Sequence, residues 1–265
     1  MKYYYFSLQL IIITFCNCSN NKASKANSLE SQNYSDSIQR ILKDTFCISC
    51  KEFNIVNTRV RDAKIDSAQA KKRIKILIPE IEKYFFEHGG KITSKSDWIF
   101  PIEGYDWRNI GGTNGSGFTT TGYNYYDGNE YKGHPAHDIF VFDKNQDCLD
   151  DRTNKPINVL SVSNGIVVAD EPFWKAGNPV KGGKYIWIYD PSFKGFFYYS
   201  HNDSIFVKSG DLIKAGQQIA FIGRTGNAAR KESPTHLHFA KFKYVNGEII
   251  PDNPYEDLKQ CKVIK

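Results

Sequence analysis

Two histidines held on one face of a strand suit either a metal ion or a proton-transfer pair, and residues 234–239 (PTHLHF) provide such a pair. His236 and His238 lie at i and i+2, in a run rich in aromatic and β-branched residues. Alternate side chains of a strand share a face, so both imidazoles are expected to project together, with Leu237 and Phe239 turned to the core. Two surface histidines on a half-exposed strand are the alternative.

A second group of metal-ligand residue types lies at 133–140 (GHPAHDIF). In extended backbone His134 and Asp138 share one face, and the small alanine between them leaves room for an ion. His137 faces the other way and is expected to pack or hydrogen bond inside the domain. Pro135 fits only the start or the edge of a strand, so irregular backbone is expected near His134.

Together the two motifs supply the ligand set of a catalytic zinc site. His134, Asp138 and His238 offer two imidazoles and one carboxylate, and three protein ligands leave a fourth position for water. A hydrolase also needs a base for that water and a hydrogen-bond donor for the developing oxyanion. His201 and His236 remain as unligated imidazoles for these two roles. A structural zinc site would prefer four closed, usually cysteine-rich ligands, which argues against a merely structural metal.

The order of these motifs resembles one family of enzymes. An HxxxD motif that begins at His134, then Tyr199-Ser200-His201, then HLHF look like the LytM/lysostaphin-type zinc endopeptidases, the glycyl-glycine endopeptidase family of cell-wall hydrolases. The resemblance extends from about residue 98 to residue 258. Flanking segments that agree with the family pattern lie at 156–168, 182–189, 210–219 and 223–226.

The resemblance implies a zinc ion held by His134, Asp138 and His238, and catalytic roles for the two remaining histidines. We assign His236 as the general base and His201 as the oxyanion stabiliser, with the exchanged roles as the alternative. The implied reaction is hydrolysis of a peptide bond in peptidoglycan stem peptides or cross-links. Some relatives lose ligands and serve as non-catalytic wall-binding or hydrolase-activating modules, whereas this chain keeps all five residues, which favours an enzyme.

The elements that must carry these residues are typical of an all-β domain at 96–262. Short runs of β-branched and aromatic residues alternate with Gly, Asn, Asp and Pro turns. This pattern predicts an antiparallel β-sandwich or partly open barrel, which the resemblance specifies as the duplicated hybrid motif of LytM and lysostaphin. Residues 104–133, rich in Gly, Asn, Thr and Tyr, are expected to wall a cleft. The predicted strands are Trp98–Ile102, His134–Phe142, Ile157–Val162, Gly165–Ala169, Lys184–Tyr189, Gly195–His201, Gln218–Gly223 and Thr235–Tyr244.

The N-terminus resembles a lipoprotein-type export signal. Residues 1–18 combine Lys2 with an apolar run too short to span a bilayer, and Cys18 is the expected lipidated residue, with Cys16 the second choice. Residues 19–34, rich in Ser, Asn and Lys, are expected to form a tether. The protein is thus expected in the cell envelope, attached to the membrane through a lipid at Cys18 and facing the periplasm or the cell surface. Plain secretion is the alternative.

Residues 35–95 are expected to form a helical N-terminal segment. The sequence predicts a short amphipathic helix over 35–42 and a longer one over 67–88, which begins with a capping box at Asp66. An apolar stripe at helical spacing in the longer helix indicates packing on the β-domain. Whether the segment also inhibits the site or docks a partner stays open.

Charge and cysteines restrict the partners further. The formal net charge of +6 weakly favours an anionic polymer or surface, and the absence of a dense Lys/Arg stripe with interleaved aromatics makes nucleic acid an unexpected partner. Cys47 and Cys50 form a CxxC motif, for which a local disulfide or two free thiols are expected. Pairings that involve Cys148 and Cys261 stay open.

One acidic segment resembles the start of a calcium loop. Asp143, Asn145, Asp147 and Asp151 place oxygen-bearing side chains at positions 1, 3, 5 and 9 of the segment. The usual glycine at the sixth position is Cys148, so a solvated acidic turn is the alternative to a calcium site.

Overall fold

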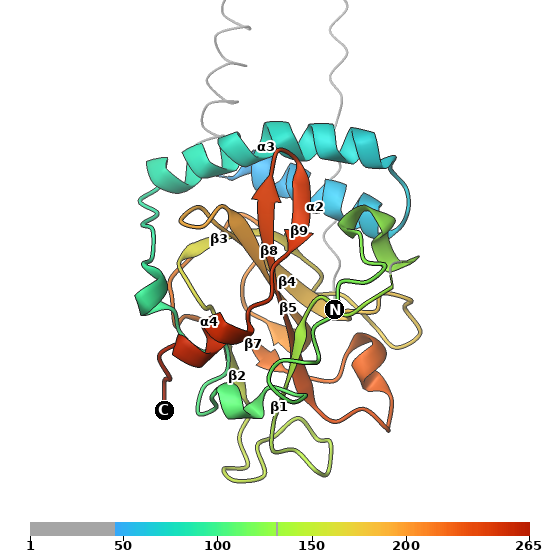
Figure 1. Ribbon diagram of the computed structural model, residues 1–265, viewed down its shortest axis with the longest axis vertical. Helices are drawn as coiled ribbons and strands as arrows, with labels where there is room; N and C mark the ends of the chain where they lie inside the picture. Colours follow the sequence, from blue (N-terminus) through green and yellow to red (C-terminus); the bar gives the residue numbers. More distant parts are fainter. Residues whose placement is uncertain (1–45, 131) are drawn as a thin grey trace, which may run out of the picture. The chain divides into compact units, whose positions relative to one another are not determined.

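One open antiparallel sheet organises the fold (Figure 1). The computed structural model describes residues 46–130 and 132–265. Its strands are β1 His137–Phe140, β2 Asn158–Leu160, β3 Gly165–Asp170, β4 Lys184–Asp190, β5 Gly195–Ile205, β6 Leu212–Ile213, β7 Gln218–Ile222, β8 His236–Val245 and β9 Glu248–Pro251. The order is β1-β8-β5-β4-β3-β6, β9 pairs with β8, and β7 pairs with both β2 and β5. All pairings are antiparallel and the sheet stays open, so the predicted mainly β, antiparallel fold with a few helices is confirmed.

The predictions for the first part of the chain lie outside the described residues. They are the signal peptide at 1–18, the tether at 19–34, lipidation at Cys18 and the helix over 35–42. In the two ranges that the structure describes, no helix is long and apolar enough to cross a membrane.

Most predicted strands are present, with shifted ends. The predicted strand Trp98–Ile102 is wrong, because this segment makes only isolated bridges, and Pro101 within it cannot donate to a ladder. The predicted strand His134–Phe142 begins three residues late, at His137, where the backbone no longer has to accommodate Pro135. The short strands β6 and β9 are additional to the prediction.

The central strands are buried on both faces. In β4, Tyr185 and Trp187 contribute to one apolar cluster, whereas Ile186 between them contributes to a second cluster on the other face. This alternation follows from the two-residue period of a strand. The first cluster lies between the sheet and the helices α2 (Ile48–Arg61) and α3 (Ser67–Glu87), so these helices cover one face of the sheet (Figure 1).

Helix α3 begins as its sequence predicts. The side chain of Asp66 accepts hydrogen bonds from the backbone N–H groups of Ala68 and Gln69, at 2.9 and 3.1 Å. Helix α2 is additional to the prediction. Its buried face includes Cys50 and Asn57, which weaken the apolar period that would mark it as amphipathic.

The CxxC motif closes a disulfide between Cys47 and Cys50, at the start of α2, which confirms the local disulfide among the open alternatives. Cys148 and Cys261 are free thiols.

The loop at 104–133 packs on α2 as well as on the sheet. Gly128 lies so close to the end of α2 that a Cβ atom would be 2.3 Å from the carbonyl oxygen of Val60. The hydroxyl group of Tyr126 donates a hydrogen bond to the carbonyl oxygen of Gly247, beyond β8. Shorter elements complete the described chain: the 3-10 helices η1 Lys95–Asp97, η2 Trp107–Asn109, η3 Tyr125–Glu130 and η4 Gly226–Ala229, and the helix α4 Tyr255–Gln260.

The docking of α2 can be tested by a truncation. Phe53 is fully buried and its ring centroid lies 5.4 Å from that of Phe196 in β5. We expect Phe53→Ala to lower the free energy of unfolding by about 3–5 kcal/mol, measured by urea denaturation. The matched control is Ile55→Ala on the same helix, where the side chain is 49% exposed; it should change stability by less than about 0.5 kcal/mol. Equal losses for the two variants would contradict the docking.

Candidate metal centre

The pairing of β1 with β8 brings the two histidine motifs together. Asp138 lies opposite His238, and Phe140 lies opposite His236. Leu237 and its neighbour Phe239 are buried in the core beneath the sheet. His236 and His238, which alternate with them, therefore project from the other face, as the two-residue period predicts.

Three potential ligand atoms form a small triangle. The Nε2 atom of His134 lies 3.2 Å from Oδ1 of Asp138 and 3.2 Å from Nδ1 of His238, and the last two atoms are 3.0 Å apart. Ligand atoms at about 2.0–2.1 Å from a tetrahedral zinc ion lie about 3.3 Å from one another, so the donor set fits zinc with a slight expansion. Within residues 46–130 and 132–265 this is the one group of three or more His, Cys, Asp or Glu side chains close enough to hold a metal ion.

The loop before β1 orients His134. His134 forms an isolated bridge with Thr119, with backbone hydrogen bonds of 2.8 and 2.9 Å in the two directions. Its Nδ1–H group donates to the carbonyl oxygen of Gly117 at 2.9 Å. A carbonyl oxygen only accepts, so the proton resides on Nδ1 and the lone pair of Nε2 faces Asp138 and His238.

A backbone irregularity in β5 aims His201 into the same cleft. Strand β5 pairs with β8 up to Ser200 and with β7 from Asn202 onward. Its register against β4 shifts in this stretch, and His201 has a φ of 67°, in the left-handed region that non-glycine residues seldom adopt. The backbone N–H of His201 donates to the carbonyl oxygen of Gly182, and its Nδ1–H group donates to that of Thr225, both at 2.9 Å.

His236 is held in a similar way. Its Nδ1–H group donates to the carbonyl oxygen of Pro234 at 2.7 Å, and its Nε2 atom lies 3.6 Å from Oδ1 of Asp138. The rings of His236 and His201 meet edge to face, with centroids 5.0 Å apart. Both imidazoles thus keep Nε2 free to accept a proton when they are neutral.

The electrostatics of the site favour the metal-binding forms of Asp138 and His238, but not that of His134. Burial raises the pKa of Asp138, but the imidazoles of His134 and His238 beside its carboxylate outweigh burial and hold that pKa below its usual range. The hydrogen bond to Asp138 raises the pKa of His134. Burial lowers the pKa of His238, and it lowers that of His201 well below the ordinary value. An ionised carboxylate and neutral imidazoles are the forms that bind metal ions.

The five residues line one cleft of about 390 Å³, together with side chains that the motifs do not indicate. Tyr198 and Ser200 are two such residues. Counting back from His201 in steps of two gives Tyr199, which is buried in the core, so strand periodicity alone does not find Tyr198. His137 is not among the lining residues. As predicted, it is fully buried on the other side, where its Nε2 atom lies 2.9 Å from Oδ1 of Asn253.

The predicted calcium loop is not supported. The carboxylate of Asp143 accepts hydrogen bonds from the backbone N–H groups of Asp147 and Cys148, both at 3.0 Å, and from the hydroxyl group of Thr235. Asp151 likewise accepts from the backbone N–H of residue 144. The carboxylates serve as turn acceptors, and those at 143, 147 and 151 do not converge on a common point.

Fold and site define the class of this protein: an open antiparallel β-domain with a candidate His/Asp/His metal centre in a cleft. The family model of peptidase family M23 matches residues 145–250, which include His201, His236 and His238, whereas His134 and Asp138 lie upstream of the match. Over residues 145–250 the chain thus matches peptidase family M23, which agrees with the resemblance of its sequence motifs to the LytM/lysostaphin type.

Solved structures show modest similarity. The catalytic domain of lysostaphin from Staphylococcus simulans is 26% identical over 50% of this chain and 81% of its own, with a TM-score of 0.35. A protein assigned as glycyl-glycine endopeptidase LytM from Ruminococcus gnavus is 25% identical over 69% of this chain and 72% of its own, with a TM-score of 0.44. A zinc-containing peptidase from Vibrio cholerae is 25% identical over 58% of this chain and 38% of its own, with a TM-score of 0.37.

The left-handed backbone at His201 predicts an unusual order of stabilities. Both His201→Ala and His201→Gly remove the ring, but alanine keeps a Cβ atom in the disfavoured region, so we expect the glycine variant to be more stable by about 1 kcal/mol. The same two substitutions at Ser200, which lacks a positive φ, should give the opposite order. Urea denaturation of the four variants tests this, and a more stable alanine variant at 201 would contradict the backbone geometry.

Proposed function

We propose that this protein is a zinc-dependent endopeptidase that hydrolyses peptide bonds in peptidoglycan. The observation that carries the proposal is the triangle of Nε2 of His134, Oδ1 of Asp138 and Nδ1 of His238 beside two further imidazoles in the same cleft. Three ligands leave a coordination position open for chemistry, and a peptidase family supplies the class of reaction.

A zinc ion at these three residues would supply Lewis-acid chemistry, which polarises a peptide carbonyl group and lowers the pKa of water. In the proposed mechanism, His236 accepts a proton from the attacking water at Nε2 and later delivers it to the leaving amine. Its Nδ1–H bond to Pro234 fixes the ring in the tautomer that this step requires. The proximity of Nε2 to Asp138 places the base at the edge of the ligand set.

His201 is proposed to stabilise the oxyanion of the tetrahedral intermediate. To donate from Nε2, the ring must take up a second proton from solvent in the cleft, while Nδ1–H stays bound to Thr225. Burial lowers the pKa of His201 and opposes this uptake, and the developing negative charge of the oxyanion favours it. The ring is buried beside that of His236, with 5.0 Å between the centroids. A positive charge on one imidazole therefore repels a positive charge on the other. The exchange of the two roles is the alternative assignment.

We further propose that the enzyme acts outside the cytoplasm, in the cell envelope. The signal-like residues 1–18 and the Cys47–Cys50 disulfide support export, because disulfides persist in oxidising compartments. Peptidoglycan is then the accessible polymer, and a lipid at Cys18 would hold the domain near it. The alternative function is a non-catalytic wall-binding or hydrolase-activating module.

Metal binding gives the first test. We expect His238→Ala to purify without stoichiometric zinc, because two remaining ligands hold the ion too weakly. The matched control is His137→Gln, which changes a neighbouring histidine that faces away from the cleft and should leave the zinc content unchanged. Metal content is measured by plasma mass spectrometry, and a full complement of zinc in His238→Ala would refute the ligand assignment.

The release of soluble peptides from purified sacculi gives the second test. We expect His236→Ala to keep zinc and to lower the rate by about 10²–10⁴-fold, the usual contribution of a general base. A glutamine side chain can donate a hydrogen bond to an oxyanion but cannot act as a base. His201→Gln should therefore retain more activity than His201→Ala, whereas His236→Gln should be as inactive as His236→Ala.

The reverse pattern would exchange the two roles. A zinc-loaded wild-type protein that releases nothing from sacculi of several cross-link types would favour the non-catalytic alternative.

A further inference from the structure

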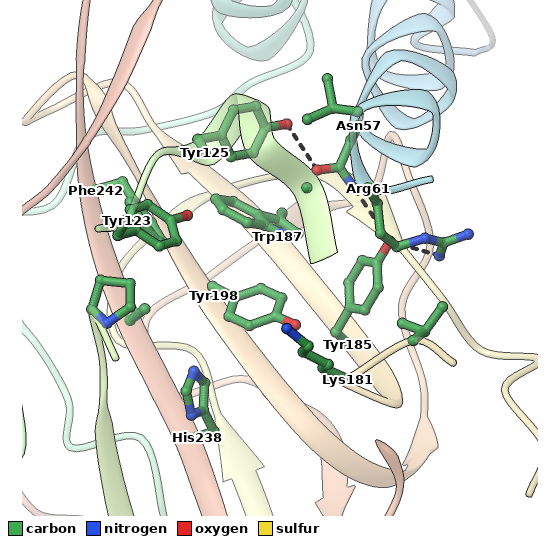
Figure 2. Close-up of a pocket in the computed structure, with 16 residues that line it drawn as sticks. Asn57, Arg61, Tyr123, Tyr125, Lys181, Tyr185, Trp187, Tyr198, His238 and Phe242 are labelled. Atoms are coloured by element: carbon green, nitrogen blue, oxygen red, sulfur yellow. Dashed lines mark hydrogen bonds between the residues drawn. The ribbon is translucent and has the colours of Figure 1, made fainter. Parts of the chain in front are cut away.

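A second pocket opens beside the metal centre, on the face of the sheet covered by α2 (Figure 2). Lys181, Gly182, Tyr198 and His238 line both this pocket and the catalytic cleft. The two spaces are therefore contiguous, and a metal-ligand residue forms the boundary between them. Figure 2 shows His238 at the end of the pocket remote from Asn57.

Aromatic rings form most of the pocket wall. The ring of Trp187 lies at the centre, with centroid distances of 4.8 Å to Tyr198, 5.0 Å to Phe242 and 5.6 Å to Tyr125. Ala240, one of the smallest lining side chains, leaves space next to these rings. We call this space the aromatic pocket; its further lining residues are Asn57, Val60, Arg61, Tyr123, Gly128, Pro135, Val180 and Tyr185.

The polar groups at the α2 end of the aromatic pocket bind one another. Tyr125 donates to Oδ1 of Asn57 at 2.9 Å, and Nδ2 of Asn57 donates to the hydroxyl oxygen of Tyr185 at 3.2 Å. The guanidinium group of Arg61 forms an ion pair with Glu171 at 2.8 Å. A charged ligand group would have to break these bonds, so the aromatic pocket suits an uncharged, apolar group.

The volume limits the size of that group. The aromatic pocket holds about 80 Å³, roughly half of the ~150 Å³ that admits a benzene ring in an apolar cavity. An aliphatic group of one to four carbons fits this space, whereas an aromatic side chain does not.

Helix α2 of the N-terminal segment forms part of the wall of the aromatic pocket. Asn57, Val60 and Arg61 all lie on α2, which precedes the residues matched by the family model. Gly128 of the loop at 104–133 packs on the carbonyl oxygen of Val60 and closes the same side. The helical segment thus shapes a space that reaches the catalytic cleft.

We propose that the aromatic pocket is a specificity subsite, which takes the small aliphatic side chain of a substrate residue next to the cleaved bond. The inference rests on the proposed peptidase function and names its substrate class: peptides with an alanine- to leucine-sized residue at that position. Glycine leaves the aromatic pocket unfilled, so a glycine-only bridge is a poor substrate. Aspartate is rejected because burial among the aromatic rings would strip water from its carboxylate, and phenylalanine is rejected because of its size.

A matched peptide series tests the subsite. The substrates are Gly-Gly-Xaa-Gly-Gly, where Xaa is glycine, alanine, valine, leucine, phenylalanine or aspartate, with the chiral residues in both L and D configurations. We expect alanine or valine of one configuration to raise kcat/KM about tenfold over glycine, the lower range for one added methylene group in a hydrophobic pocket. Phenylalanine and aspartate should fall below glycine.

Substitutions on α2 test whether the aromatic pocket causes the substrate preference. Val60→Phe fills the aromatic pocket and should abolish the advantage in kcat/KM of the alanine and valine peptides over the all-glycine peptide. Val60→Ala enlarges the aromatic pocket and should shift the substrate preference toward leucine. This variant keeps the proposal testable if Val60→Phe does not fold. The matched control is Val56→Ala, an equal truncation at a buried position of the same helix that does not line the aromatic pocket; its selectivity should equal that of the wild type.

Binding separates failure of the subsite from failure of the proposed function. Non-hydrolysable analogues of the same peptides, with a reduced bond on either side of Xaa, are titrated into the zinc-loaded protein by calorimetry. A side-chain preference in binding that Val60→Phe removes, without hydrolysis of any peptide, would retain the subsite and refute the peptidase. Hydrolysis and binding that are equal for glycine, alanine and valine, or a Val56→Ala variant with the selectivity of Val60→Ala, would overturn the subsite.

Discussion

The change of partner along β5 is the constraint on which the rest of the site depends. Strand β5 pairs with β8 up to Ser200 and with β7 from Asn202 onward. His201 lies between these two ladders. A regular strand would continue straight, and alternation alone would direct residue 201 away from the face that carries Ser200 and Tyr198. The left-handed backbone at His201 breaks the alternation, so that its ring lies beside those of His236 and His238.

Backbone carbonyl groups then set the chemistry of the imidazoles. His134, His201 and His236 each donate Nδ1–H to a carbonyl oxygen, of Gly117, Thr225 and Pro234 respectively. A main-chain acceptor cannot rotate away or ionise, so the tautomer follows from the fold and needs no further charged residue. The loops that carry these carbonyl groups are therefore part of the site even though they contribute few side chains to the cleft.

The parts of the site that depend on local periodicity could be predicted from the sequence. The pair at His236 and His238 and the cap at Asp66 each depend on a few neighbouring residues and on a fixed geometric period. The aromatic pocket could not be predicted in this way. Its hydrogen bond between Asn57 and Tyr185 joins residues 128 positions apart, and no local pattern specifies such a pair.

In the proposed enzyme, reactivity and selectivity come from different parts of the molecule, which meet at His238. The ligand atoms and the two further imidazoles come from β1, β5, β8 and the loop before β1, whereas the far wall of the aromatic pocket comes from α2 and the loop at 104–133. A change of side chain on α2 alters the shape of that wall without moving the backbone of β8. In the proposed peptidase, substrate preference could therefore vary through the helical segment while the ligand triangle stays intact, and residues 46–95 would then do more than cover the sheet.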